Sequence, residues 1–171
     1  MLGVVGLGKI GSHVTKVAKA MGMNVIAFDP FVSAERAQQM QVRLTTLEDL
    51  FRQADYITLH IPRTPDTENL VNAELLRTMK PTARIVNCAR GGIVDEAAIA
   101  EAIETGVIAG AGLDVFASEP LAQDSPLRGV ERGLVLTPHL GASTEEAQEN
   151  VAIDVAEQIR DVLLGLSLIH I

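Results

Sequence analysis

The chain has 171 residues, of which 47% are hydrophobic, so we expect one folded domain with a sizeable core rather than a disordered chain. Its formal net charge of −8 argues against nonspecific binding to nucleic acid or to an anionic membrane. With one cysteine, no apolar run of membrane-spanning length and no secretory leader, the sequence predicts a cytoplasmic protein without an intramolecular disulfide.

The first thirty residues predict a strand, a helix and a second strand. Residues 2–5 form a short apolar run that is typical of a buried parallel strand. From Ile10 to Met21, apolar residues recur at steps of three and four, which indicates an amphipathic helix, and Gly22 suits its C-terminal end. A second apolar run, residues 25–28, ends at Asp29.

Three glycines separate the first strand from the helix. Gly6, Gly8 and Gly11 have G-x-G-x-x-G spacing, and Asp29 follows the last of them by 18 residues. This context predicts a dinucleotide site in which Gly6 permits the turn, Gly8 lets the backbone approach a pyrophosphate, and Gly11 lets helix and strand pack closely. The free N–H groups and the dipole of the helix would face the phosphates. A βαβ unit with the same turn and no ligand is the alternative.

Asp29 also bears on which dinucleotide binds. A carboxylate at this position accepts hydrogen bonds from a ribose 2′-hydroxyl and repels a 2′-phosphate. The first basic residue after it is Arg36, seven positions on. The sequence therefore favours NAD over NADP.

Strands and helices continue to alternate along the chain. Thr45 with Glu48, and Ser143 with Glu146, have the spacing of helix capping boxes. Alternation of this kind predicts an α/β fold with a doubly wound parallel sheet between two helical layers, the Rossmann type. The expected helices are 33–40, 45–51, 74–79, 95–105 and 143–164, and the expected strands are 42–44, 56–60, 83–88, 109–115 and 134–137.

These elements form a single predicted unit, residues 1–165. The apolar segment that follows, residues 166–171, has no partner in the pattern, and we expect it not to belong to the native fold.

Ligands of such sheets bind at the C-terminal ends of the strands, and three charged or titratable residues follow strand ends. Arg90 can clamp a carboxylate, His139 can carry a proton, and Glu119 can raise the pKa of that histidine and orient it. Taken alone, Arg90 could equally be an ordinary surface residue beside a turn, and a single histidine such as His139 is more often structural than catalytic. Cys88 is interpreted as a small strand-end residue rather than a nucleophile, and no Cys/His spacing indicates a metal site.

Several motifs together resemble the D-isomer-specific 2-hydroxyacid dehydrogenase family. They are "GLGKIG", "LHIPRTPDT", "VNCARGGIVDE", "AGAGLDVFASEP" and "TPHLGAST", in the family's order, and the resemblance covers residues 2–165. "NCARGG" with "PHLGAST" is most similar to the D-3-phosphoglycerate dehydrogenase branch. The family also has a second, substrate-binding domain, which has no counterpart in this sequence.

The resemblance implies roles for individual residues. Arg90 would bind the substrate carboxylate and carbonyl. His139 would carry the proton, and Glu119 would pair with it. Asp114 would lie at the nicotinamide. Further NAD contacts are implied for Lys9, Ile10, Ile61, Pro62, Thr67, Cys88, Ala89, Arg90, His139, Leu140, Gly141 and Ala142.

The implied activity is oxidation of a small, anionic D-2-hydroxy acid with NAD. In the branch named above, this acid is 3-phosphoglycerate. The implied assembly is a homodimer. An apolar stripe of Val151, Val155, Ile159 and Val162 on the last helix could serve association. Two alternatives remain open: a glyoxylate/hydroxypyruvate reductase or other 2-hydroxyacid dehydrogenase, and a dehydrogenase-like NAD sensor or corepressor. The absent domain would carry the residues that select the substrate.

Overall fold

The computed structural model describes residues 1–139, 141 and 144–165. Its internal contacts separate two units, Met1–Pro138 and His139–Ile171, and each is described by itself. The tail predicted to lie outside the native fold, residues 166–171, is outside the described residues.

The first unit is built on a parallel sheet. Within the described residues it has seven strands in the order β3-β2-β1-β4-β5-β6-β7, and all neighbouring pairs are parallel. This order confirms the predicted doubly wound sheet, with its switch point between β1 and β4. The strands are β1 (Leu2–Val5), β2 (Val25–Phe28), β3 (Arg43–Leu44), β4 (Tyr56–Leu59), β5 (Arg84–Asn87), β6 (Gly110–Leu113) and β7 (Leu134–Leu136).

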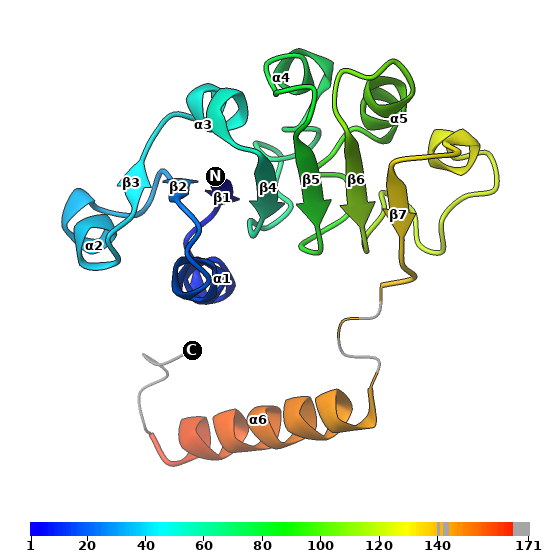
Figure 1. Cartoon of the computed structure of the whole chain (residues 1–171). Helices are drawn as coiled ribbons and strands as arrows, with labels where there is room; N and C mark the ends of the chain where they lie inside the picture. The colour runs from blue at the N-terminus through cyan, green and yellow to red at the C-terminus, as the bar shows by residue number, and fades with distance from the viewer. Residues whose placement is uncertain (140, 142–143, 166–171) are drawn as a thin grey trace. The chain divides into compact units, whose positions relative to one another are not determined.

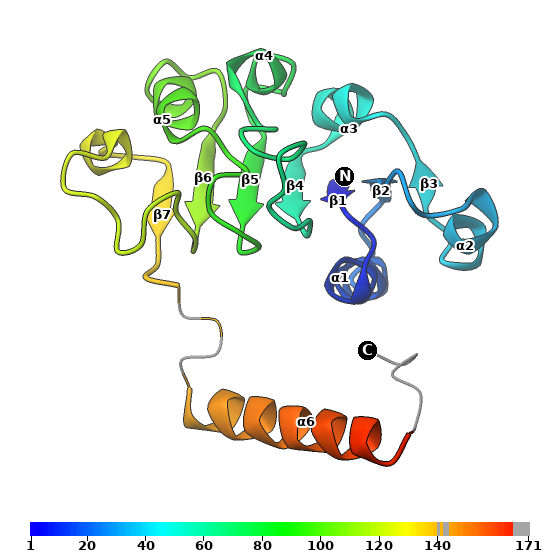
Figure 2. The ribbon, with the colours of Figure 1, turned by 180° about the vertical axis from the view of Figure 1, so that it is seen from behind.

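Helices line both faces of this sheet. Helices α3, α4 and α5 lie along one side, and α1 and α2 lie along the other (Figure 1). The view from behind in Figure 2 shows the same division. The helices of the first unit are α1 (Lys9–Ala20), α2 (Ala34–Gln39), α3 (Leu47–Gln53), α4 (Ala73–Leu76), α5 (Glu96–Glu104) and the short 3-10 helix η1 (Pro126–Gly129).

Two apolar clusters hold this unit together. The larger one joins the sheet to α3, α4 and α5 and includes the fully buried Phe51, Ile57 and Ile99. The smaller one includes Val4, Ala18 and Ala27, from β1, α1 and β2. The sheet is therefore packed on both faces around β1, as parallel sheets require.

The second unit contains one long helix, α6 (Glu145–Leu163), and none of its residues is buried. Among the described residues, no helix is long and apolar enough to cross a membrane.

The structure corrects details of the prediction at the helix starts. Helix α3 is capped by Thr46, whose hydroxyl accepts from the N–H of Asp49, rather than by Thr45. Helix α6 is capped by Thr144, which accepts from the N–H of Ala147, and the predicted cap, Ser143, lies outside the described residues. Where two threonines or a serine and a threonine are adjacent, either residue can be the N-cap, and the local sequence pattern does not show which one is used.

Candidate functional site

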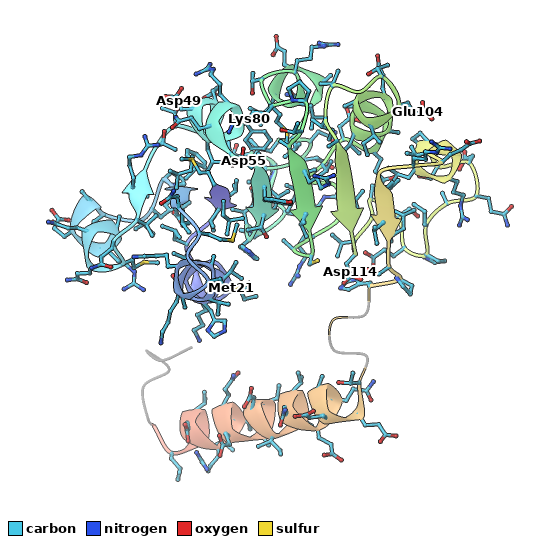
Figure 3. All side chains as sticks on the ribbon, in the orientation of Figure 1. Met21, Asp49, Asp55, Lys80, Glu104 and Asp114 are labelled. Carbon is cyan, nitrogen blue, oxygen red and sulfur yellow. The ribbon has the colours of Figure 1, made fainter. Side chains whose placement is uncertain are left out.

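Because all seven strands run in the same direction, their C-terminal ends meet at one edge of the sheet. The predicted site residues of the first unit lie in the loops that leave this edge, after β1, β2, β4, β5 and β6, or in the first turn of α1. Figure 3 labels one of them, Asp114, where β6 ends beside β7.

The glycine-rich loop after β1 is tightly built. Gly6 has a φ of +93°, and a Cβ placed on it would lie 2.5 Å from the carbonyl oxygen of His60. A Cβ on Gly11 would lie 1.9 Å from the carbonyl oxygen of Gly6. Gly8 differs, because a Cβ placed there would meet nothing within 4 Å. Two glycines are therefore required by the fold, whereas the third borders open space.

The helix that follows has no side-chain cap. Gly8 is the N-cap of α1, it forms no side-chain cap hydrogen bond, and the first turn contains no acidic residue. Among the described α-helices, the other five are capped by Ser33, Thr46, Asn72, Asp95 and Thr144 and have an acidic residue in the first turn. Among the described α-helices, α1 is thus the one whose start has neither a side-chain cap nor an acidic first-turn residue beside the positive end of its dipole.

Asp29 lies beside this loop. One carboxylate oxygen accepts from the N–H of Leu7 at 2.7 Å, and the other accepts from the N–H of Phe31 at 2.9 Å. The hydroxyl of Ser12 donates to the carbonyl of Leu7 at 2.7 Å, so both polar groups of the Leu7 backbone are held by side chains. Since each carboxylate oxygen has a second lone pair, Asp29 can still accept from a ribose hydroxyl.

His60, at the end of β4, supports the loop from behind. Its Cβ would lie 3.4 Å from a Cβ on Gly11, and its Nε2 is 3.0 Å from the hydroxyl of Thr58. Burial lowers the pKa of this histidine, so the neutral ring is favoured.

The loop after His60 is ordered by its own side chains. The hydroxyl of Thr67 donates to the carbonyl of Pro62 at 2.7 Å and accepts from the N–H of Thr64 at 2.7 Å. The Cγ2 of Ile61 would lie 2.8 Å from a Cβ on Gly6. The structure therefore brings Ile61 to the glycine-rich loop and ties Thr67 to Pro62.

A buried amide organises the loop that carries Arg90. Asn87 is 1% exposed, and its side chain accepts from the N–H of Ala89 and donates to the carbonyl of Arg90, both at 3.0 Å. The guanidinium of Arg90 is exposed and donates to the carbonyl of Ala89 at 2.6 Å. Asn87 thus fixes the backbone while the cation remains in contact with solvent.

The ends of three neighbouring strands, β5, β6 and β7, are followed by Cys88, Asp114 and Thr137. The hydroxyl of Thr137 donates to the carboxylate of Asp114. Partial burial and then the negative charge of Asp114 raise the pKa of the Cys88 thiol. A thiol with a raised pKa is a poor nucleophile, which agrees with the structural interpretation of Cys88.

The loop after β6 places Glu119 beside the Arg90 loop. The carboxylate of Glu119 accepts from the N–H of Phe116 at 3.1 Å, and Glu96 of α5 accepts from the N–H of Ala117 at 2.7 Å. A Cβ on Gly91 would lie 1.7 Å from the carbonyl oxygen of Phe116. The loops of two predicted catalytic residues, Arg90 and Glu119, are therefore in direct backbone contact.

The remaining predicted residues belong to the second unit or lie outside the described residues. His139 has a left-handed φ of +54° and begins the second unit, so its predicted pairing with Glu119 stays a prediction. Gly141 belongs to the same unit. Leu140 and Ala142 lie outside the described residues.

Sequence reasoning did not single out Ser12, Asn87 or Glu96, which position the loops. Asn87 offered a signal, since it is the polar residue at the end of an otherwise apolar run. Ser12 and Glu96 are ordinary helix-start residues, and their partners are 5 and 21 positions away along the chain.

These features fit a dinucleotide. The bare start of α1 can take a diphosphate, the open side of Gly8 leaves it room, and Asp29 can take a ribose. In the described ranges, no group of three His, Cys, Asp or Glu side chains could hold a metal ion.

Comparison with known proteins gives consistent matches. A model of the "D-isomer specific 2-hydroxyacid dehydrogenase, NAD binding domain" family matches residues 1–141. The D-3-phosphoglycerate dehydrogenase of Synechocystis sp. is 68% identical over 165 residues, which cover 96% of this chain and 29% of that protein. The chain therefore spans about three tenths of the length of this curated relative.

Solved structures agree on the fold. A protein from Thermus thermophilus has a TM-score of 0.83 and 38% identity, covering 97% of this chain and 51% of that one. The D-lactate dehydrogenase of Aquifex aeolicus, complexed with NAD and lactic acid, has a TM-score of 0.83 and 31% identity, covering 96% of this chain and 53% of that one.

Proposed function

The chain belongs to the D-isomer specific 2-hydroxyacid dehydrogenase family as its NAD-binding domain, and from that premise we propose that it serves NAD-dependent oxidation of 3-phosphoglycerate to 3-phosphohydroxypyruvate. The 68% identity to a D-3-phosphoglycerate dehydrogenase supports this substrate among the 2-hydroxy acids. The product places the reaction in serine biosynthesis.

The observation that carries the cofactor role is the uncapped start of α1 at Gly8. Its N–H groups would bind the pyrophosphate, and the carboxylate of Asp29 would accept from the adenosine ribose while it holds Leu7. Asp114 and Cys88 end adjacent strands farther along the same edge, where the nicotinamide would lie. The other proposed contacts are Lys9, Ile10, Ile61, Pro62, Thr67, Ala89, Leu140, Gly141 and Ala142.

Three side chains would carry the reaction. Arg90 would bind the substrate carboxylate through two parallel hydrogen bonds and polarise the forming carbonyl. His139 would take the proton of the 2-hydroxyl group, and Glu119 would stabilise the resulting imidazolium. NAD, when bound, supplies the acceptor for the hydride from C2 of the substrate.

The rest of the parent protein would complete the substrate site. Arg90 is exposed in this chain, so its charge is screened by water, and a covering domain would remove that water and orient the substrate. We therefore expect the chain alone to bind NAD and to turn over 2-hydroxy acids poorly.

We further place the protein in the cytoplasm as a homodimer. Val151, Val155, Ile159 and Val162 lie at helical spacing on α6 and are 46–55% exposed, as an association stripe would be. A light-scattering mass equal to the monomer at micromolar concentration would contradict association of this chain.

The cofactor role is tested by calorimetric titration of NAD and NADP into the wild-type chain and the Asp29→Asn variant. The amide has one acceptor oxygen where the carboxylate holds two N–H groups, and it lacks the charge that repels a 2′-phosphate. We expect NAD affinity to fall roughly tenfold and the preference for NAD over NADP to shrink. Thr46→Ala, which removes a cap on the opposite face of the sheet, is the control. Failure of the wild-type chain to bind NAD would refute the proposal.

A further inference from the structure

A groove between α1 and α2 is lined by cations although the chain is acidic. Its volume is about 380 Å³, within the size range of small-molecule sites. Lys16, Lys19 and Arg36 line it together with Ser12, Thr15 and Gln39, and no acidic residue does. The two helices lie side by side on one face of the sheet (Figure 1). By contrast, a groove beside α3 and α4 is lined by Glu48 and Glu74.

The charges in this groove are not neutralised by the protein. The ammonium of Lys19 donates to the carbonyls of Met40 and Gln41 at 2.8 and 3.1 Å and to the Gln41 side-chain oxygen at 3.1 Å. These acceptors are uncharged, so they fix the position of the ammonium and leave its charge in place. Within the described residues, neither Lys16 nor Arg36 forms an ion pair.

A buried hydroxyl in the same groove lacks a partner. Thr15 is 1% exposed and is the buried residue of the lining. Its Oγ1 is the side-chain oxygen that remains buried without a hydrogen bond among the described residues. An unpaired buried hydroxyl destabilises a fold, so such a group is expected where a ligand supplies the missing partner.

From these observations we propose that the α1–α2 groove binds a phosphate group carried by a small soluble molecule. Two ammonium groups and a guanidinium complement the two charges of a phosphate dianion better than the one charge of a carboxylate. The hydroxyl of Thr15 can donate to one of the phosphate oxygens. The groove lies along the second and third turns of α1, beyond the first-turn N–H groups assigned to the pyrophosphate of NAD. The site is therefore distinct from the cofactor site, although Ser12 borders both.

The probe is inorganic phosphate, followed by backbone-amide NMR of the whole chain with and without saturating NAD. Residue-resolved shifts separate the groove from the start of α1, which also attracts anions. We expect saturable shifts at Lys16, Arg36 and Gln39 that persist with NAD present. Pyrophosphate should act similarly and acetate should not. Shifts confined to residues 6–11 and abolished by NAD would overturn the proposal.

Charge variants show whether the groove itself binds. Lys16→Gln with Arg36→Gln should weaken phosphate binding roughly tenfold through loss of two charge-assisted contacts. Arg77→Gln with Arg132→Gln, both exposed and outside the groove, makes the same change in net charge and should leave binding unchanged. Equal weakening by the two pairs would mean general charge attraction and would refute the site.

Thr15→Val separates binding from stability. The variant removes the unpaired hydroxyl at nearly constant volume, so its melting temperature without phosphate should rise by roughly 2–5 °C. Its phosphate affinity should nevertheless fall several-fold. Unchanged phosphate affinity in this variant would overturn the assignment of Thr15 to the ligand.

Discussion

Two strand-to-helix connections leave the same edge of the sheet and differ in how the helix that follows is capped. The connection from β1 to α1 ends at Gly8 and leaves the helix without a cap. The connection from β5 to α5 ends at Asp95, which accepts from the N–H groups of Ala97 and Ala98, both at 3.0 Å. Glu96 adds a second acidic group in the first turn of α5.

The difference shows that one sheet edge can carry helix starts that are stabilised in two different ways. At α5 the helix start is satisfied internally, and Glu96 uses its carboxylate to hold the neighbouring loop at Ala117. At α1 no side chain caps the helix, the preceding loop contacts Asp29, Ser12 and His60, and we propose that the first N–H groups bind the pyrophosphate.

The largest expected effect comes from giving α1 the cap that the other helices have. Gly8→Asp fits the backbone, since φ is −64° and a Cβ there meets nothing within 4 Å. The new carboxylate would occupy the helix N–H groups and repel the pyrophosphate, so we expect NAD affinity to fall roughly 100- to 1,000-fold without loss of thermal stability. Calorimetry and thermal melting measure the two effects. Gly129→Asp, on the exposed η1, is the charge control, and retained NAD binding in Gly8→Asp would disprove the role of this helix start.

The next effect concerns packing between the loops of Arg90 and Glu119. Gly91→Ala would place a Cβ 1.7 Å from the carbonyl oxygen of Phe116, so one loop must shift, and we expect a loss of about 1–3 kcal/mol in the free energy of unfolding. Gly8→Ala, which meets open space, should leave this free energy within a fraction of a kcal/mol. Chemical denaturation compares the two variants. A similar stability for both would show that the loop contact is not constrained.

Removal of the cap of α5 should lower stability without affecting binding. Asp95→Ala leaves two N–H groups unpaired, and we expect a cost of about 0.5–2 kcal/mol in unfolding free energy. NAD affinity should remain that of the wild type, because Asp95 is not among the proposed NAD contacts. A parallel loss of NAD affinity would mean that the two helix starts are coupled.

The smallest effect is a pH dependence from His60, which contacts the glycine-rich loop. Burial lowers its pKa, so below pH 6.5 the unfolded chain takes up a proton that the folded chain resists, and stability falls as the pH decreases toward the folded-state pKa. His60→Gln should flatten this part of the stability profile relative to wild type. Melting temperatures from pH 7 to pH 5 measure the difference, and parallel profiles would contradict a neutral buried ring.

The order of the elements was predictable because it follows from local pattern. Residues 2–5 are an apolar run that ends at the glycine-rich turn, residues 25–28 are one that ends at Asp29, and each became a parallel strand. Helix starts were predicted to within one residue where threonines are adjacent. The 3-10 helix Pro126–Gly129 was not predicted. Its apolar residue Leu127 is 1% exposed because it packs against α5 and nearby residues, and this contact has no local pattern in the sequence.

Residue types and spacing determined the fold class, the family and the candidate residues Gly6, Gly8, Asp29 and Arg90. Those properties depend on backbone sterics, hydrophobic periodicity and motif order, which are local along the chain. The tertiary structure alone decided which groups support them. Asp29 meets Leu7, Glu96 meets Ala117, and α1 meets α2 around the unpaired Thr15 only after distant segments pack, because a hydrogen bond across 21 or 22 positions leaves no periodic trace in the sequence.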